Sequence, residues 1–230
     1  MTGMDATTLL RETLTLTEGT TGRVILGIAG APGAGKSTLA EYLVAAAGER
    51  LGPGSTAYVP MDGFHLSNAQ LARLGLTGRK GSEPSFDGWG YAALLRRIRE
   101  HGEEPVYAPG YSRILHEPVA ALHVVEPSAR LVVTEGNYLA VGTGPWPSAR
   151  ACLDELWFLD APDAVREERL RGRHTATGSS AEVARARVTG NDRPNGLLVA
   201  ATRNACDRVI TLEGPPGPPP RSRPRGPATG

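Results

Sequence analysis

The chain has 230 residues, 40% of them hydrophobic and 21% charged, with a formal net charge of +1. This composition is typical of one globular α/β domain with a lid or small insertion, and the charge gives no general attraction to nucleic acid or acidic membranes. No apolar run approaches the ~20 residues of a membrane helix, and the N-terminus lacks signal-peptide features. The two cysteines form no CxxC pair. We therefore expect a cytoplasmic protein that binds neither membrane nor nucleic acid.

Apolar, β-branched runs alternate with helical patterns along the chain. They predict five strands, at residues 23–29, 55–61, 129–134, 153–159 and 207–212. They also predict helices at residues 5–17, 37–47, 91–101, 164–173 and 181–189. Strands that alternate with helices favour an α/β fold with a doubly wound, parallel, five-stranded sheet.

The segment between the second and third strands is long and contains two Gly/Pro-rich stretches, 75–90 and 105–118. Segments of this length are usually functional, so we assign residues of about 63–128 to a substrate-binding insertion. Residues 1–214 then form one domain. The remaining residues, 215–230, consist mainly of Pro, Gly and Arg, cannot bury a core, and are expected to be a disordered tail.

Residues 30–37 read GAPGAGKS and match the phosphate-loop pattern GxxxxGKS/T between a strand and a helix. In this pattern backbone N–H groups surround phosphate oxygens, Lys36 reaches the β- and γ-phosphates, and the Ser37 hydroxyl binds Mg²⁺. A Rossmann dinucleotide loop has a different glycine spacing. The sequence therefore predicts a P-loop NTPase fold with ATP and Mg²⁺ as cofactors. The expected nucleotide-binding residues are Gly30, Ala31, Pro32, Gly33, Ala34, Gly35, Lys36, Ser37 and Thr38.

Two carboxylates follow predicted strands at the edge where ligands of a doubly wound sheet bind. Asp62 comes directly after the second strand, where it would orient an acceptor hydroxyl and take its proton, or simply open a turn before Gly63. Glu135 ends the third strand, the position from which an acid holds Mg²⁺ directly or through water. We expect Asp62 on the acceptor side and Glu135, with Ser37, on the metal.

Together, these motifs resemble the P-loop kinase family of pantothenate kinase, uridine kinase and phosphoribulokinase. Residues 84–87 (PSFD) are similar to a P-x-x-F/Y-D stretch of that family, and residues 109–112 (PGYS) resemble its P-x-Y-S/D stretch. Residues 191–195 (NDRPN) resemble a bacterial uridine-kinase-like subgroup that is also described as fructose-transport-associated. The resemblance covers residues of about 24–212.

The resemblance implies an ATP-dependent kinase that phosphorylates a hydroxyl of a small metabolite. It implies that Asp62 acts as base or orienter, that Asp87 contacts acceptor hydroxyls, and that Glu135 serves the metal. Gly63 and Arg113 stand where the uridine and pantothenate kinase motifs have Ser and His, which leaves sugars, nucleosides and vitamin precursors open as acceptors. The implied acceptor-binding residues are Asp62, Phe64, His65, Asp87, Tyr111, Arg113 and Asn137.

Arginines crowd the end of the predicted helix 164–173. A mobile lid at about 166–190 would bring them over ATP, neutralise charge and exclude water, whereas the alternative is a solvated basic face. The resemblance favours Arg169 and Arg173 as the catalytic pair. In the insertion, the adjacent Arg79 and Lys80 would clamp an anionic acceptor or, more simply, face solvent.

Other interpretations stay open at this point. A nucleotide-switch NTPase would act on a protein partner, and a nucleoside monophosphate kinase would phosphorylate a phosphate, although Asp62 would repel such an acceptor. The Arg-rich tail would give only weak, salt-sensitive binding to nucleic acid. The expected partner is a small hydroxylated substrate, and a homodimer is left open.

Overall fold

A computed structural model describes residues 3–100, 102–214 and 216–217. The predicted disordered tail at 215–230 therefore falls, except for residues 216 and 217, outside the described residues. Within the described part of the chain, no helix is long and apolar enough to cross a membrane. Both cysteines are free; Cys152 is buried and Cys206 is half-buried.

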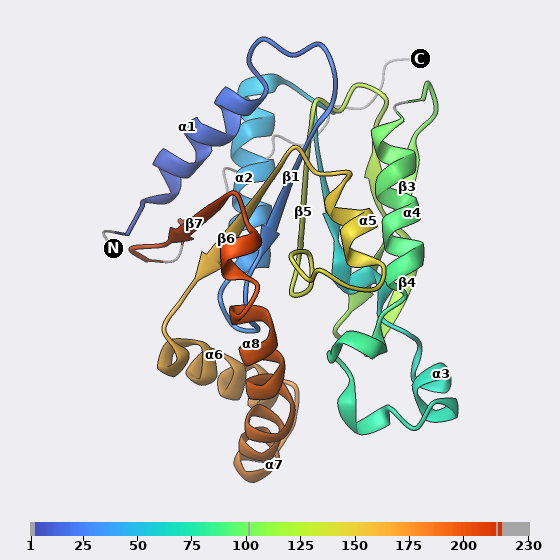
Figure 1. Cartoon of the computed structure of the whole chain (residues 1–230), viewed down its shortest axis with the longest axis vertical. Helices are drawn as coiled ribbons and strands as arrows, with labels where there is room; N and C mark the ends of the chain where they lie inside the picture. Colours follow the sequence, from blue (N-terminus) through green and yellow to red (C-terminus); the bar gives the residue numbers. More distant parts are fainter. Residues whose placement is uncertain (1–2, 101, 215, 218–230) are drawn as a thin grey trace, which may run out of the picture.

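The centre of the molecule is a sheet of five parallel strands in the order β2-β5-β1-β6-β7 (Figure 1). The strands are β1 (Val24–Ala29), β2 (Thr56–Pro60), β5 (Leu131–Gly136), β6 (Glu155–Asp160) and β7 (Arg208–Thr211). Every residue of β1 and β5 is buried, as expected where helices cover both faces of a parallel sheet. The predicted doubly wound, five-stranded parallel sheet is confirmed.

Helices cover the two faces and form two hydrophobic cores. On one face lie α1 (Ala6–Leu16) and α2 (Lys36–Leu51), which bury Leu9, Leu10, Leu39 and Leu43 in the core on this face. On the other face lie α4 (Gly88–Arg99) and the short α5 (Trp146–Arg150). Burying one large apolar side chain contributes about 1.5–3 kcal/mol, so these two layers hold the sheet that carries the site.

The chain between β2 and β5 contains more regular structure than the predicted insertion. It forms α3 (Asn68–Arg73), α4, and a hairpin of β3 (Val106–Ser112) and β4 (Glu117–Val125). The Gly/Pro-rich stretch 105–118 lies in this hairpin, and Pro109 and Gly110 stand where the register of the hairpin shifts. A bulge is one of the few places in a strand that accepts proline and glycine.

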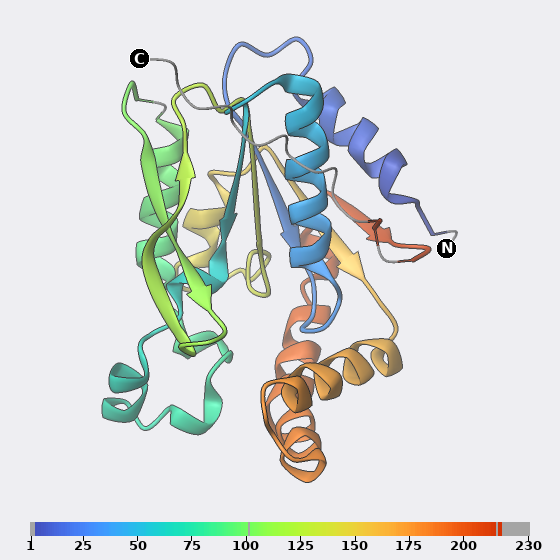
Figure 2. The same cartoon turned by 180° about the vertical axis from the view of Figure 1, so that it is seen from behind.

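A helical projection follows β6 and extends beyond the carboxyl ends of the strands, on the side away from the α3 region. It consists of α6 (Asp163–Ala176), α7 (Ala181–Arg187) and α8 (Arg193–Ala200), with one π-helical turn, Val188–Asp192, joining α7 directly to α8. The predicted lid, residues of about 166–190, lies within this projection, in which α8 continues the helix beyond Pro194; proline is accepted in the first turn of a helix. Figure 2 shows this projection and the α3 region on opposite sides below the sheet.

Candidate active site

The phosphate loop joins β1 to α2. Gly30, Gly33 and Gly35 all have positive φ angles, of 154°, 81° and 101°. A Cβ atom on Gly33 would lie 2.6 Å from the carbonyl oxygen of Arg166, so the loop also needs glycine for space. Gly35 caps α2 without any side-chain hydrogen bond, which leaves the first N–H groups of the helix for an anion.

Lys36 lies under this loop and is only 7% exposed. Its ammonium donates to the side-chain oxygen of Asn137 at 2.8 Å and to the carbonyl of Ala31 at 3.3 Å. Burial lowers the pKa of Lys36, and the charges of Glu135 and Asp62 only partly offset this effect. A bound polyphosphate would supply the missing negative charge and favour the charged ammonium.

Glu135, at the end of β5, is 4% exposed and accepts hydrogen bonds from Ser37 (3.0 Å) and Tyr58 (2.9 Å) on the same oxygen, Oε1. Burial raises its pKa, the charge of Asp62 raises it further, and Lys36 opposes both. A hydroxyl and a carboxylate at this separation suit Mg²⁺, which takes few protein ligands and completes its shell with phosphate oxygens and water. These two residues would hold the ion.

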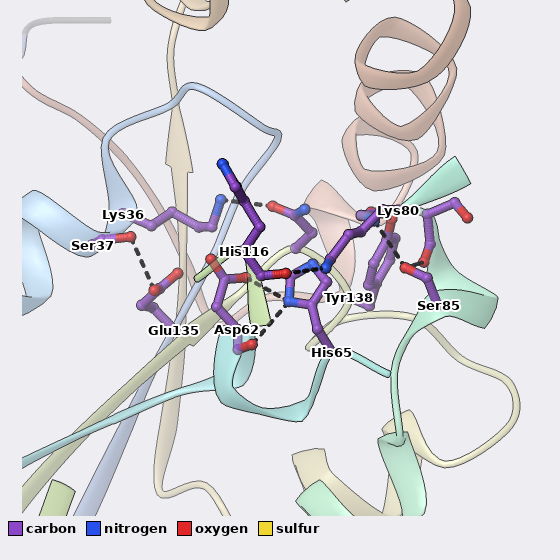
Figure 3. A network of polar contacts seen from close by, with 12 residues as sticks. Lys36, Ser37, Asp62, His65, Lys80, Ser85, His116, Glu135 and Tyr138 are labelled. Carbon is purple, nitrogen blue, oxygen red and sulfur yellow. Dashed lines mark hydrogen bonds and ion pairs between the residues drawn. The ribbon is translucent and has the colours of Figure 1, made fainter. Parts of the chain in front are cut away.

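Asp62 lies between Glu135 and His65 (Figure 3), on a short 3₁₀ turn after β2. Its side chain is 46% exposed, and its Oδ1 is 3.9 Å from Nδ1 of His65. The same Nδ1 is 2.8 Å from the Asp62 carbonyl oxygen, which can only accept, so Nδ1 carries the hydrogen. Burial lowers the pKa of His65, which favours the neutral ring, and this ring holds the Asp62 backbone through its Nδ1–H group.

A pocket of about 300 Å³ opens beside Asp62. Polar side chains form almost all of its wall, and the lining residues are Ser37, Thr38, Glu41, Tyr58, Pro60, Asp62, Tyr111, Arg113 and Glu135. The pocket therefore brings the predicted metal group, the predicted base and two predicted acceptor residues, Tyr111 and Arg113, to one place. The rings of His65 and Tyr111, 4.9 Å apart, extend the site toward the hairpin.

Three of the four arginines of α6 lie in different environments near the phosphate loop or the site. Arg166 is buried, donates to the Pro32 carbonyl at 3.0 Å, and forms an ion pair with Asp163. Arg169 donates to the carbonyls of Gly33 and Ala34 at 3.3 and 3.1 Å. Arg173 is exposed; burial chiefly lowers the pKa of Lys36 and His65, and the charge of Arg173 lowers both further, as expected of an arginine near the site.

Two predicted acceptor-binding residues, Asp87 and Phe64, make structural contacts. Asp87 accepts a hydrogen bond from the Gly90 N–H at 2.8 Å and so caps α4. Phe64 is half-buried and packs edge-on against Tyr91, with ring centroids 5.3 Å apart. Neither residue lines the pocket beside Asp62.

Sequence reasoning missed Tyr58 and the role of Arg166. Tyr58 has a recognisable signal, because a tyrosine inside a buried parallel strand needs a partner for its hydroxyl, and that partner is Glu135. For Arg166 the chain offers no such signal, since the residue stands among several similar arginines and only the fold brings it under the phosphate loop.

Comparison with known proteins gives consistent results, although no family model matches the chain. A Schizosaccharomyces pombe protein whose name assigns it provisionally to the uridine kinases is 35% identical over 194 residues, 82% of this chain and 83% of that protein. A pantothenate kinase from Mycolicibacterium vanbaalenii is 34% identical over 138 residues, covering 60% of this chain and 43% of the relative. A crystal structure from Silicibacter sp. TM1040, provisionally described as a fructose transport system kinase, has a TM-score of 0.80 at 34% identity, covering 90% of this chain and 99% of that one.

Proposed function

Because the chain belongs to the P-loop kinase family that includes uridine and pantothenate kinases, we propose that it transfers the γ-phosphoryl group of ATP to a hydroxyl of a small metabolite. The observation that carries this proposal is the position of Asp62, a half-exposed carboxylate beside Glu135 and at the wall of a polar pocket. An acceptor hydroxyl bound there would meet a group able to take its proton.

The reaction follows from the groups around the pocket. The acceptor oxygen attacks the γ-phosphorus while its proton passes to the Asp62 carboxylate, and the bond from the γ-phosphorus to the bridging oxygen breaks to release ADP. Lys36 and the N-terminus of α2 stabilise the charge on the phosphates, and Arg173 would approach from the lid. Ser37 and Glu135 would hold Mg²⁺, which would supply positive charge to neutralise the phosphates.

The pocket wall supports a polyhydroxylated acceptor that is neutral or singly charged. Hydroxyl and charged groups dominate the lining, and only Tyr58 and Tyr111 contribute rings. An acceptor that lacks hydroxyls would leave the hydrogen-bonding groups of this wall unpaired. Such a site therefore favours hydroxylated acceptors over analogues without hydroxyls. A phosphate acceptor, as in nucleoside monophosphate kinases, would be repelled by Asp62 and Glu135.

The test is an ADP-release screen with ATP and Mg²⁺ against sugars, sugar alcohols, vitamins, pantothenate and nucleosides, with phosphorylated product identified by mass. Turnover of a polyol or sugar, with its hydroxyl phosphorylated, supports the proposal. Efficient turnover of uridine or cytidine with sugars inert would reverse the acceptor class while leaving the reaction in place. Slow ATP hydrolysis that no small molecule accelerates would instead favour a nucleotide switch.

A further inference from the structure

Lys80 is one of only two lysines in a chain that contains 23 arginines. The other, Lys36, has a place in the phosphate loop. Lys80 lies in the turn before α4, where its ammonium donates to the side-chain oxygen of Asn68 at 2.6 Å and to the carbonyl of His116 at 2.5 Å (Figure 3). The sequence left two roles open for Lys80, a clamp on an anionic acceptor or exposure to solvent. Its hydrogen bonds within the protein correspond to neither role.

These bonds tie down the tip of the β3–β4 hairpin. His116 has a φ of 53°, a left-handed conformation that is unfavourable for residues other than glycine. Its carbonyl also accepts from the side chain of Asn68 at 3.3 Å, and Glu117 accepts from the Asn68 backbone N–H at 2.9 Å. A strained residue held by several bonds indicates that the position of the tip matters.

The tip directly follows the residues of the hairpin that reach the acceptor pocket. Tyr111 and Arg113 both line that pocket. The Lys80 ammonium also lies 5.2 Å from the centroid of the Tyr111 ring, a cation–π distance. A displacement of Lys80 would therefore move the acceptor wall and leave the phosphate loop in place.

The backbone of the same turn contacts the lid. The Lys80 carbonyl accepts from the side chain of Asn191 at 3.0 Å. The Gly81 carbonyl accepts from Asn195 at 3.4 Å and from the Tyr138 hydroxyl at 2.7 Å. Gly81 has a φ of 93°, so the turn depends on glycine. The Lys80–Gly81 turn thus joins the hairpin tip, the core and the α7–α8 junction of the lid.

A lysine suits this position better than an arginine. An ammonium presents three donors around one atom and can converge on two oxygens at 2.5–2.6 Å while remaining beside a ring. A guanidinium is larger and planar, and its donors point outward in a fixed fork. In a chain that otherwise uses arginine, this geometry accounts for the lysine.

We propose that Lys80 is a positioning residue that fixes the acceptor wall through the hairpin tip and, through the Lys80–Gly81 turn, the α7–α8 end of the lid. The link to acceptor binding rests on the proposed function, whereas the link between tip and lid does not. Contacts that join two segments predict reciprocal coupling: loosening either one should loosen the other.

The test is amide hydrogen exchange on the full chain with Mg²⁺ and a non-hydrolysable ATP analogue. Lys80→Met keeps the aliphatic stem, Lys80→Arg keeps the charge, and Arg79→Met is the matched control because Arg79 is the exposed neighbour. We expect both Lys80 variants to raise exchange about tenfold or more at residues 111–119 and 188–196, since each loses bonds to a charged donor, with β1 and the Arg79 variant unchanged. Asn191→Ala should raise exchange at 79–82.

A second arm uses the best acceptor from the ADP-release screen. Lys80→Met should raise the acceptor KM about tenfold and change kcat and the analogue Kd less than about threefold, because Lys80 touches neither phosphate nor Asp62. Wild-type exchange in Lys80→Arg, an equal effect of Arg79→Met, or a rise that includes β1 would each overturn the proposal. Raised exchange at residues 111–119 with unchanged exchange at residues 188–196 would also overturn the proposal. If no acceptor is found, the exchange arm still decides between these outcomes.

Discussion

Replacing Asp62 by Asn tests the assignment of the two carboxylates. The substitution keeps the shape of the side chain and removes the base. We expect kcat to fall by about 10²–10⁴-fold, the usual contribution of a general base, which corresponds to about 3–5 kcal/mol of barrier. The loss should lie at the low end if the transition state is loose, because the proton then moves late.

The structure predicts that little else changes in this variant. The Asp62 carboxylate is 46% exposed, and its Oδ1 lies 3.9 Å from Nδ1 of His65, whose pKa is lowered by burial. Loss of so exposed a charge should change the free energy of unfolding by less than about 0.5 kcal/mol. Its influence on Mg²⁺ at Glu135 should stay below about 1 kcal/mol, so half-saturating Mg²⁺ should change by less than about fivefold.

Steady-state kinetics at varied Mg²⁺, with nucleotide binding measured by calorimetry, separates these effects. Glu103→Gln, which neutralises an exposed carboxylate outside the pocket, is the matched control and should behave as wild type. If Asp62→Asn chiefly shifts the Mg²⁺ requirement and kcat recovers at high Mg²⁺, Asp62 is a metal group. The acceptor hydroxyl would then lie on the other side of the γ-phosphate.

Three further predictions concern the nucleotide side. Lys36→Ala should abolish transfer and weaken ATP binding, because it removes the point charge on the phosphates; unchanged turnover would contradict the phosphate-loop assignment. Gly33→Ala should abolish nucleotide binding, since a Cβ there lies 2.6 Å from a carbonyl oxygen and φ is 81°; a normal Kd by calorimetry would refute this. Glu135→Gln should raise the half-saturating Mg²⁺ concentration, with excess Mg²⁺ restoring part of the rate. Burial raises the pKa of Glu135 in the folded state above its ordinary 4.5, so the wild-type protein loses stability as the pH rises from that value through the folded-state pKa. The Glu135→Gln variant should therefore be more stable than wild type at a pH of about 8, but not below a pH of about 4. Equal melting temperatures of the two proteins at both pH values would contradict this prediction.

The parts of the fold that the sequence could predict are those with strong local signals. The phosphate loop and the five strands are examples, because apolar β-branched runs and the fixed spacing of residues 30–37 leave few alternatives. The hairpin β3–β4 was not predictable in this way. Proline and glycine read as loop residues, and only pairing with β4 shows that they occupy a bulge.

The same limit applies to the site. Glu135 and Asp62 could be placed because each follows a predicted strand, and parallel strands bring their carboxyl ends to one edge. Asp87 stands in a family-like motif, yet its carboxylate caps α4, and a cap and an acceptor ligand look alike in sequence. Tyr58 and Lys80 act through partners 77 and 36 residues away, and no local pattern encodes such distances.

The π-helical turn at Val188–Asp192 widens the helix that runs from α7 into α8. It winds one extra residue into the helix between α7 and α8, and its last two residues each meet a partner outside it: Asn191 at the Lys80 carbonyl, and Asp192 at His174, 2.9 Å away. Deleting one residue here would remove the extra residue that the wide turn accommodates and restore an ordinary α-helix, with α7 and α8 close to their present rotational phase. Asn191 and Asp192 could not then both occupy the positions from which they reach their partners, so the length of this helix is fixed to the single residue even though most of its surface faces solvent.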